Sequence, residues 1–370
     1  MKAKIVSVFL CVSLVCTAGC WDQRMLRDYT IVRGFGLDLA ADGRILVTCS
    51  LPNFTKMVQS QSIVVSGVGD TPADAFEVID RKVAKEIDRS NNRLIFIGEE
   101  LVKKRGMYPL LDFLYRSPRD SLNAHLAIVQ GRANDFKKAQ VGEATLLADY
   151  LDDLIKSAEL STQIPIVNVQ SVSPLFFNPG EDAFLPYVQC HDNEASVNGI
   201  ALFNGQRLSG KLSFDEAMLF LLLADRKGRE AKLTHRVKMG GKKRDLNPFI
   251  TVNVESMKRK LKVSVSKTGQ PSSDLRLLLR VNVIEFPRDQ LNNAREVQAL
   301  NEQLSRYFTE RAQAVVRKLQ QANCDALGIG RRLIAFHFDT WKKLDWKKTY
   351  PHMTITPHVT VEIVKRGIID

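Results

Sequence analysis

The first half of the chain alternates between strand-like and helix-like patterns of apolar residues. Asp42-Gly43 stands between two β-rich runs, which is typical of a hairpin turn. The predicted strands lie at 29–32, 34–38, 45–48, 63–65, 94–97 and 124–130. The predicted helices lie at 71–87, 99–104, 109–115 and 142–158. This half is therefore expected to be a mixed α/β unit.

One helix start is clearly marked. Thr71 is placed to cap a helix whose first residue is Pro72. Apolar residues then recur at spacings of three and four, which predicts a buried helical face formed by Phe76, Ile79, Val83 and Ile87.

The second half has longer strand patterns and one long helix. Residues 165–189 are expected to be an extended loop with short strands, and Asn204-Gly205 predicts a hairpin between 197–203 and 208–212. The remaining predictions are a helix at 214–224 capped by Ser213, antiparallel sheet from 230 to 286, an amphipathic helix at 289–323 and a final strand at 353–364. Pro357 within that strand predicts a sheet edge or a bulge.

Together these elements predict a multidomain α+β protein. We expect mixed and antiparallel sheets packed with helices, and a long amphipathic helix near the carboxyl terminus. The expected division is a signal peptide at 1–19, an N-terminal α/β domain at 20–190, a mostly antiparallel β domain at 191–278 and a C-terminal domain at 279–370.

The amino terminus has the pattern of a lipoprotein signal peptide. Lys2 and Lys4 precede an uninterrupted apolar or small stretch at 5–18, which is too short for a comfortable membrane span. Small residues then precede Cys20, as in a bacterial lipobox, so we expect a diacylglycerol on the Cys20 thiol. The alternative is a conventional secreted protein with a spare cysteine.

The remaining cysteines form no complete disulfide framework. Outside the signal peptide and Cys20 only Cys49, Cys190 and Cys324 remain, and three is an odd number. We expect three buried thiols, with a Cys49–Cys190 bridge as the alternative.

Composition adds one strong feature, which is a concentrated positive charge. The chain has 53 Lys and Arg against 41 Asp and Glu, and residues 226–262 hold 13 of the basic residues with only three acids. This segment can contact anionic headgroups or an acidic partner, or it can be a solvated sheet face. Candidate contact residues are Lys242, Lys243, Arg244, Lys258, Arg259 and Lys260. Nucleic acid is not expected, because neither a recognition helix nor stacking aromatic residues accompany the charge.

The motifs of common enzyme classes are absent from the sequence. It has no Gly-x-Ser-x-Gly, His-Glu-x-x-His or phosphate-binding glycine-rich loop with Lys-Ser/Thr. Cys190-His191-Asp192 is weak evidence for a metal, and Glu99-Glu100 is better explained as a helix start. Trp341 and Trp346 among lysines would suit either a membrane interface or ordinary packing. We expect no enzyme activity, cofactor or metal.

Several ordered motifs resemble one known family. Cys20-Trp21-Asp22 follows the signal, and further matching segments lie at 34–38, 97–101, 111–118, 199–203, 208–212 and 324–328, with Trp341 and Trp346. In this order they resemble a C-subunit of a bacterial spore germinant receptor, of the Ger(x)C lipoprotein family. Met25 and Ser117 depart from the usual Glu and Asp of the family.

The resemblance implies a three-domain α+β lipoprotein on the outer face of the spore inner membrane. It implies integral-membrane A and B subunits as partners and a non-enzymatic part in nutrient-triggered germination, and it leaves open contact with the nutrient. Trp21 and Asp22 are expected to serve processing or membrane-proximal contact. The alternative from another class is a solute-binding lipoprotein of a transporter. That class needs two lobes of repeated βα units, against which the antiparallel run at 230–286 argues.

Overall fold

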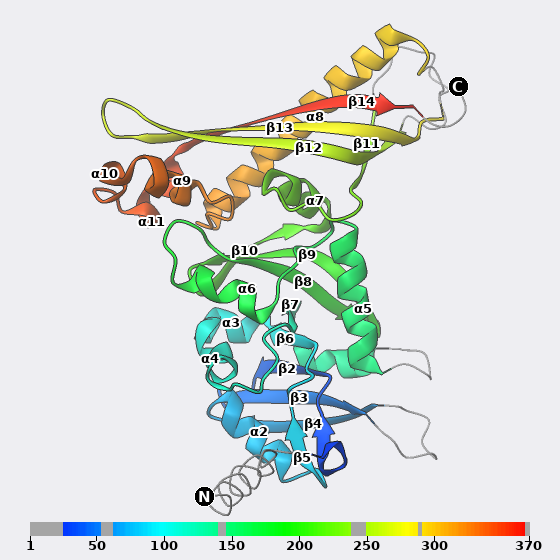
Figure 1. Ribbon diagram of the computed structural model, residues 1–370, viewed down its shortest axis with the longest axis vertical. Coiled ribbons are helices and arrows are strands. Elements are labelled where there is room, and N and C mark those ends of the chain that lie inside the picture. Colours follow the sequence, from blue (N-terminus) through cyan, green and yellow to red (C-terminus); the bar gives the residue numbers. More distant parts are fainter. Residues whose placement is uncertain (1–24, 53–61, 140–145, 238–248, 288–290, 367–370) are drawn as a thin grey trace, which may run out of the picture.

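The computed structural model describes residues 25–52, 62–139, 146–237, 249–287 and 291–366. Two large sheets follow one another along the longest axis of the molecule (Figure 1). The first described residue, Met25, lies near a small parallel pair formed by β1 (Tyr29–Ile31) and β5 (Glu86–Asp88). This pair and helix α2 (Pro72–Asp80) mark one end of the molecule, and the second large sheet marks the other (Figure 1).

The first sheet has eight strands in the order β10-β9-β8-β7-β6-β2-β3-β4. Its strands are β2 (Gly34–Leu39), β3 (Ile45–Pro52), β4 (Ser62–Gly69), β6 (Leu94–Gly98), β7 (His125–Gln130), β8 (Phe184–His191), β9 (Glu194–Asn204) and β10 (Arg207–Ser213). The four central strands β2, β6, β7 and β8 are parallel, and the strands at both edges are antiparallel. The strand order runs along the long axis (Figure 1), so the sheet forms the body of the molecule.

Helices cover both faces of the eight-stranded sheet, as its nearly continuous apolar central strands require. One face packs against α2, α3 (Glu99–Arg105), α4 (Tyr108–Arg116) and α6 (Val169–Val172). The other packs against the 3₁₀ helix η2 (Ala133–Lys138) and α5 (Leu147–Leu160).

The second sheet has four strands in the order β11-β12-β13-β14. They are β11 (Lys232–Arg236), β12 (Phe249–Val265), β13 (Pro271–Glu285) and β14 (Thr354–Lys365). The first three are antiparallel, whereas β14 pairs parallel to β13. The long helix α8 (Ala294–Gln321) makes the crossover that a parallel pair needs.

One core joins α8 to the inner face of the second sheet. Leu300, Leu304, Phe308 and Val315 of the helix are buried against the inward residues of β12, β13 and β14. Helix α7 (Phe214–Leu223) belongs to the same core and links it to the eight-stranded sheet. Short helices α9 (Ile329–Phe336), α10 (Phe338–Trp341) and α11 (Trp346–Thr349) lie beside it.

The predicted fold class and most of the predicted elements are confirmed. Thr71 caps α2, Ser213 caps α7 in a capping box, and Pro357 lies in β14 at a sheet edge. Two predictions were wrong. The helix expected at 71–87 ends at Asp80, whose carboxylate accepts a hydrogen bond from the backbone of Ile87 and so fixes the turn into β5. The segment expected to be extended contains α6 and the 3₁₀ helix η3 (Ser173–Phe176).

The expected domain boundaries fall inside strands. The 190/191 boundary lies in β8 and the 278/279 boundary lies in β13. Strands β9 and β10 complete the first sheet, whereas β11 to β14 form the second. The three-domain division stays a prediction, and the two sheets are the units used below.

Candidate functional site

The outer face of the four-stranded sheet carries the described part of the predicted basic segment. Apolar residues of β12 and β13 point to the α8 side, so the alternate residues point outward. A bulge at Glu255 decides which residues of β12 point outward. Val254 pairs with Val281, whereas Ser256 pairs with the next residue of β13, Arg280, so Glu255 is left without a partner in the strand pairing. The extra residue shifts the alternation by one position and places the following lysines outside.

Lys258, Lys260 and Lys262 form an exposed row on this outer face, which we call the lysine ladder. Across the strands, Lys260 lies opposite Arg276, which in turn lies opposite His358. Directly opposed like charges destabilise a sheet. In the described part of the chain no ion pair involves a ladder lysine, so the row has positive charge available for a partner.

Three other cations of this face are neutralised locally. Arg276 pairs with Asp274 at 2.9 Å, Arg280 pairs with Glu362 at 3.3 Å, and Lys365 pairs with Glu255. Among the described residues of β12 and β13, the unpaired cations of this face are therefore the ladder lysines, and the exposed Arg236 of β11 adds one more.

Arg259 does not belong to the lysine ladder, although it stands between two of its members. Its side chain points to the other face, where Nε donates to the Leu223 carbonyl at 2.6 Å and Nη2 donates to the Leu327 carbonyl at 3.0 Å. Burial lowers its pKa from the ordinary arginine value. The predicted contact patch is thus split, with Lys258 and Lys260 outside and Arg259 inside.

Six predicted site residues lie outside the described residues: Cys20, Trp21, Asp22, Lys242, Lys243 and Arg244. Their roles stay predictions.

The half-buried Asp182 and the buried Asp325 join the two sheets. Asp182 accepts hydrogen bonds from the backbone N–H groups of Gly205 and Asp325, both at 2.9 Å. Asp325 in turn accepts from the N–H groups of Ile329 at 2.9 Å and Gly330 at 2.7 Å, which begin α9. Burial raises the pKa of both carboxyls, and that of Asp325 reaches about 7.

Glycines permit a close approach at the same joint. A Cβ on Gly330 would lie 2.6 Å from the Cα of Gly180 and 2.9 Å from the Trp346 ring. The Trp346 ring also packs 5.7 Å from Tyr350 and 5.4 Å from Trp341. This packing accounts for the two tryptophans, so the membrane-interface alternative is not needed for them.

The matching family models cover both units. The N-terminal domain of spore germination proteins matches residues 22–190, and the C-terminal domain described as "Spore germination B3/GerAC like" matches residues 198–367. The chain belongs to this Ger(x)C family of spore germination proteins. The suspected resemblance is thereby confirmed.

Individual relatives agree with the family over nearly the whole chain. Spore germination protein GerQC of Bacillus cereus is 22% identical over 372 residues and covers 100% of both chains. Spore germination protein KC of Bacillus subtilis is 21% identical and covers 98% of this chain and 96% of its own. The crystal structure of the GerBC protein has a TM-score of 0.59 at 16% identity, with 93% of this chain and 100% of that chain covered. At that identity the structural likeness supports the fold.

The family motifs of this chain are mainly structural. Asp38, which is 1% exposed, accepts hydrogen bonds from the backbone of Ala133 and Asn134, both at 2.8 Å, and so holds η2 on the sheet. A Cβ on Gly98 would lie 2.3 Å from the Asp38 carboxylate, so only glycine fits there. Cys324-Asp325 of the last motif lies in the joint described above.

The acidic pair Glu99-Glu100 lies in the first turn of α3, as expected for a helix start. Glu99 also accepts from the Tyr187 hydroxyl at 3.0 Å and from the Gly131 N–H at 3.3 Å. These contacts link the start of α3 to β8 and to the residue after β7, and they give the carboxylate a structural use.

The candidate metal motif is a hairpin turn. Asp192 and Asn193 both have positive φ angles, which is typical of the turn that joins β8 to β9, and His191 is exposed beside Asp192. Among the described residues no cluster of His, Cys, Asp and Glu has the arrangement of a metal site. Cys49 and Cys324 are buried free thiols and Cys190 is a half-buried one.

Sequence reasoning missed a buried polar cluster under α5. His125 Nδ1 lies 2.7 Å from Asp152 and its Nε2 lies 3.7 Å from Glu159. The hydrogen bond to Asp152 raises the pKa of His125. Spacing along the chain gives no signal for this cluster, because His125 is on a strand and its two partners are on α5, two helical turns apart.

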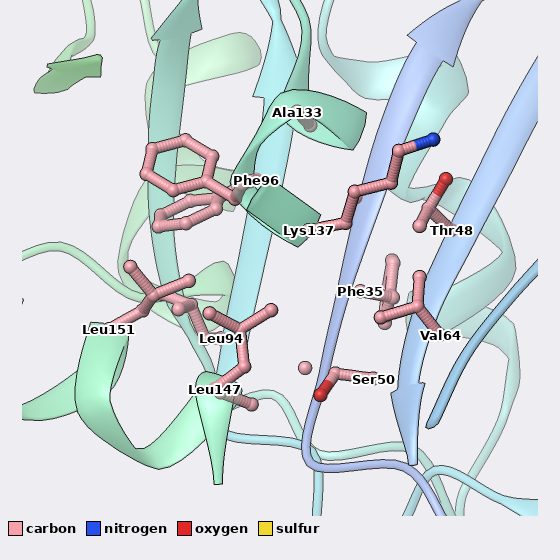
Figure 2. A pocket seen from close by; sticks show the side chains of 14 residues that line it. Phe35, Thr48, Ser50, Val64, Leu94, Phe96, Ala133, Lys137, Leu147 and Leu151 are labelled. Atoms are coloured by element: carbon pink, nitrogen blue, oxygen red, sulfur yellow. The ribbon is translucent and has the colours of Figure 1, made fainter. Parts of the chain in front are cut away.

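A small pocket opens between η2 and α5 over the eight-stranded sheet. Figure 2 shows Leu94, Leu147 and Leu151 on one side of it and Thr48 and Ser50 on the other. Its volume of about 40 Å³ holds only a few water molecules, so it is a packing gap and not a ligand site.

None of the described helices combines the length and the apolar character needed to cross a bilayer. The 28-residue helix α8 is long enough, but it carries charged residues along its exposed side.

Proposed function

We propose that this protein is a lipid-anchored, non-enzymatic subunit of a nutrient germinant receptor in the spore inner membrane. In this proposal Cys20 carries the lipid, and the lysine ladder contacts an acidic surface of an integral-membrane receptor subunit. Family membership and the full-length similarity to spore germination proteins support the receptor role. The lipobox ending at Cys20 supports the anchor.

The ladder's place in the fold favours a protein partner over the bilayer that would hold Cys20. Met25 comes just before β1, whose partner β5 lies at one end of the molecule, and β12, which carries the ladder, lies toward the other end (Figure 1). Seven steps between eight strands already separate the edges of the first sheet by about 34 Å. Five residues from Cys20 to Met25 reach at most about 17 Å. An anchor at Cys20 therefore leaves the ladder well away from the headgroups.

A non-enzymatic role is supported by the use of the candidate carboxylates. Asp38, Glu99, Asp182 and Asp325 are all bonded to backbone N–H groups that hold loops or helix starts in place. The solute-binding alternative is not favoured, because one unit is an eight-stranded mixed sheet and the other a four-stranded sheet crossed by a single long helix.

Nutrient-induced germination of spores tests the proposed role. Spores that lack this gene would be complemented with wild type or with Cys20→Ala, and the loss of optical density would follow the response. We expect no response in the deletion and no rescue by Cys20→Ala at equal protein level. Rescue by Cys20→Ala would contradict the anchor, and a normal response of the deletion to each nutrient would contradict the receptor role.

A further inference from the structure

A second basic feature lies between the two units, on the side of β12 opposite to the lysine ladder. A cleft of about 520 Å³ is bounded by β8, the end of α7, β12 and α9. This volume is within the usual range for small-molecule sites. Four arginines line it, namely Arg226, Arg259, Arg331 and Arg332, against the acids Glu181 and Asp225. The lining therefore has a net positive charge.

The arginines are not all neutralised by the protein. Glu181 pairs with Arg331. In the described residues, Arg226, Arg259 and Arg332 have no ion pair. Arg259 is the half-buried one, and its bonds to the carbonyls of Leu223 and Leu327 supply dipoles but no counter-charge. Asp225 and Glu181 attract Arg259 electrostatically but form no ion pair with it. A partly desolvated guanidinium without a directly bonded anion is costly, and a bound anion would lower that cost.

The cleft also offers an apolar surface. Phe336 is 68% exposed at its rim, which is unusual for a phenylalanine, and the Arg332 guanidinium lies 5.9 Å from its ring centroid. Phe184, Leu261 and Leu327 contribute to the wall. Guanidinium groups recognise carboxylates and phosphates through paired hydrogen bonds, and an aromatic ring accepts a flat apolar body.

We propose that this cleft binds a small organic anion, which is a carboxylate or phosphate monoester with an apolar body. The anionic group pairs with Arg259 and with Arg226 or Arg332, and the apolar body packs on Phe336. The assignment does not depend on the receptor role, since it rests on the cleft alone.

Calorimetric titration of the mature chain tests the site with three probes of one shape. Benzoate and phenyl phosphate carry the two anionic groups, and benzamide is the neutral control. We expect saturable 1:1 binding of at least one anion, with benzamide at least about tenfold weaker because it lacks the charge. The comparison of benzoate with phenyl phosphate shows which group the arginines prefer.

Two variants of equal charge change locate the binding. Arg226→Gln/Arg332→Gln should lower the affinity for the anion by about tenfold or more. Lys258→Gln/Lys260→Gln on the opposite face should change it less than about twofold, because these lysines are screened from the cleft. All four side chains are exposed, so both proteins should fold, which unfolding midpoints would verify.

Several results would overturn the proposal. They are failure of both anions to bind, equal binding of benzamide, or an equal loss in the two variants. Binding of a hexaglutamate peptide without binding of either small anion would also overturn it, in favour of a docking site for an acidic protein segment.

Discussion

Buried carboxylates hold distant segments of this chain together at single residues. Asp38 and Asp325 each accept two backbone N–H groups, and each is 1% exposed. A carboxylate is suited to this use because two oxygens satisfy two donors that would otherwise be buried without partners. The sequence indicates these residues only as parts of family motifs. Their hydrogen bonds cannot be predicted from it, because the donors are backbone N–H groups, which nearly every residue has.

The raised pKa of Asp325 makes stability depend on pH in a defined direction. Burial moves it from 3.8 to about 7, so the folded chain retains a proton that the unfolded chain loses. The contribution of Asp325 to stability is therefore full below the unfolded pKa, and it falls as pH rises from about 4 to about 7, by up to about 1.4 kcal/mol per unit.

Asp325→Asn should remove this dependence. We expect the variant to be less stable at pH 5, because it loses one of two acceptors, and to have a smaller slope between pH 5 and 7. Urea unfolding across that range would measure both effects, with the exposed Asp339→Asn as a control. An unchanged slope in Asp325→Asn would show that other groups, such as Asp182, carry the dependence.

At the scale of elements, pattern and structure agree where a face is buried along its whole length. The alternating strands β12 and β13 and the buried stripe of α8 follow their apolar periodicity, and Thr71 and Ser213 cap α2 and α7 as predicted. Prediction failed where a tertiary contact decides the conformation. Val83 and Ile87 continue the helical spacing of α2, yet the bond from Ile87 to Asp80 and pairing with β1 turn the chain into a strand.

The bulge at Glu255 gives a test at this scale. Deletion of Glu255 should leave regular strand pairing between β12 and β13, because Val254 and Ser256 already pair with adjacent residues of β13. We expect the free energy of unfolding to change by no more than about 1 kcal/mol. Deletion of Lys258 should instead reverse the alternation of one part of β12 and destabilise the fold severely. Equal effects of the two deletions in urea unfolding would contradict this account of the bulge.

At the scale of the whole molecule, the arrangement of the two units decides what each basic feature faces. The charge excess of residues 226–262 was predictable from the sequence, but its division between an outer ladder and an inner cleft was not. Because side chains alternate along β12, Arg259 faces the opposite side from its neighbours Lys258 and Lys260. The bulge at Glu255 decides that the lysines, and not Arg259, face outward. The separation of the ladder from Met25 follows from the strand order, which no local pattern specifies.

The most direct test of the central claim is the germination rate of spores that carry Lys258→Glu/Lys260→Glu. These exposed side chains have no ion pairs in the described structure, so stability should change by less than about 0.5 kcal/mol. Arg295→Glu/Arg306→Glu on the exposed side of α8 is the control of equal charge change. At equal protein levels we predict that the ladder variant fails to respond to nutrient, as the deletion does, and that the control responds normally. A normal rate in the ladder variant, or an equal loss in the control, would contradict a partner contact through the ladder.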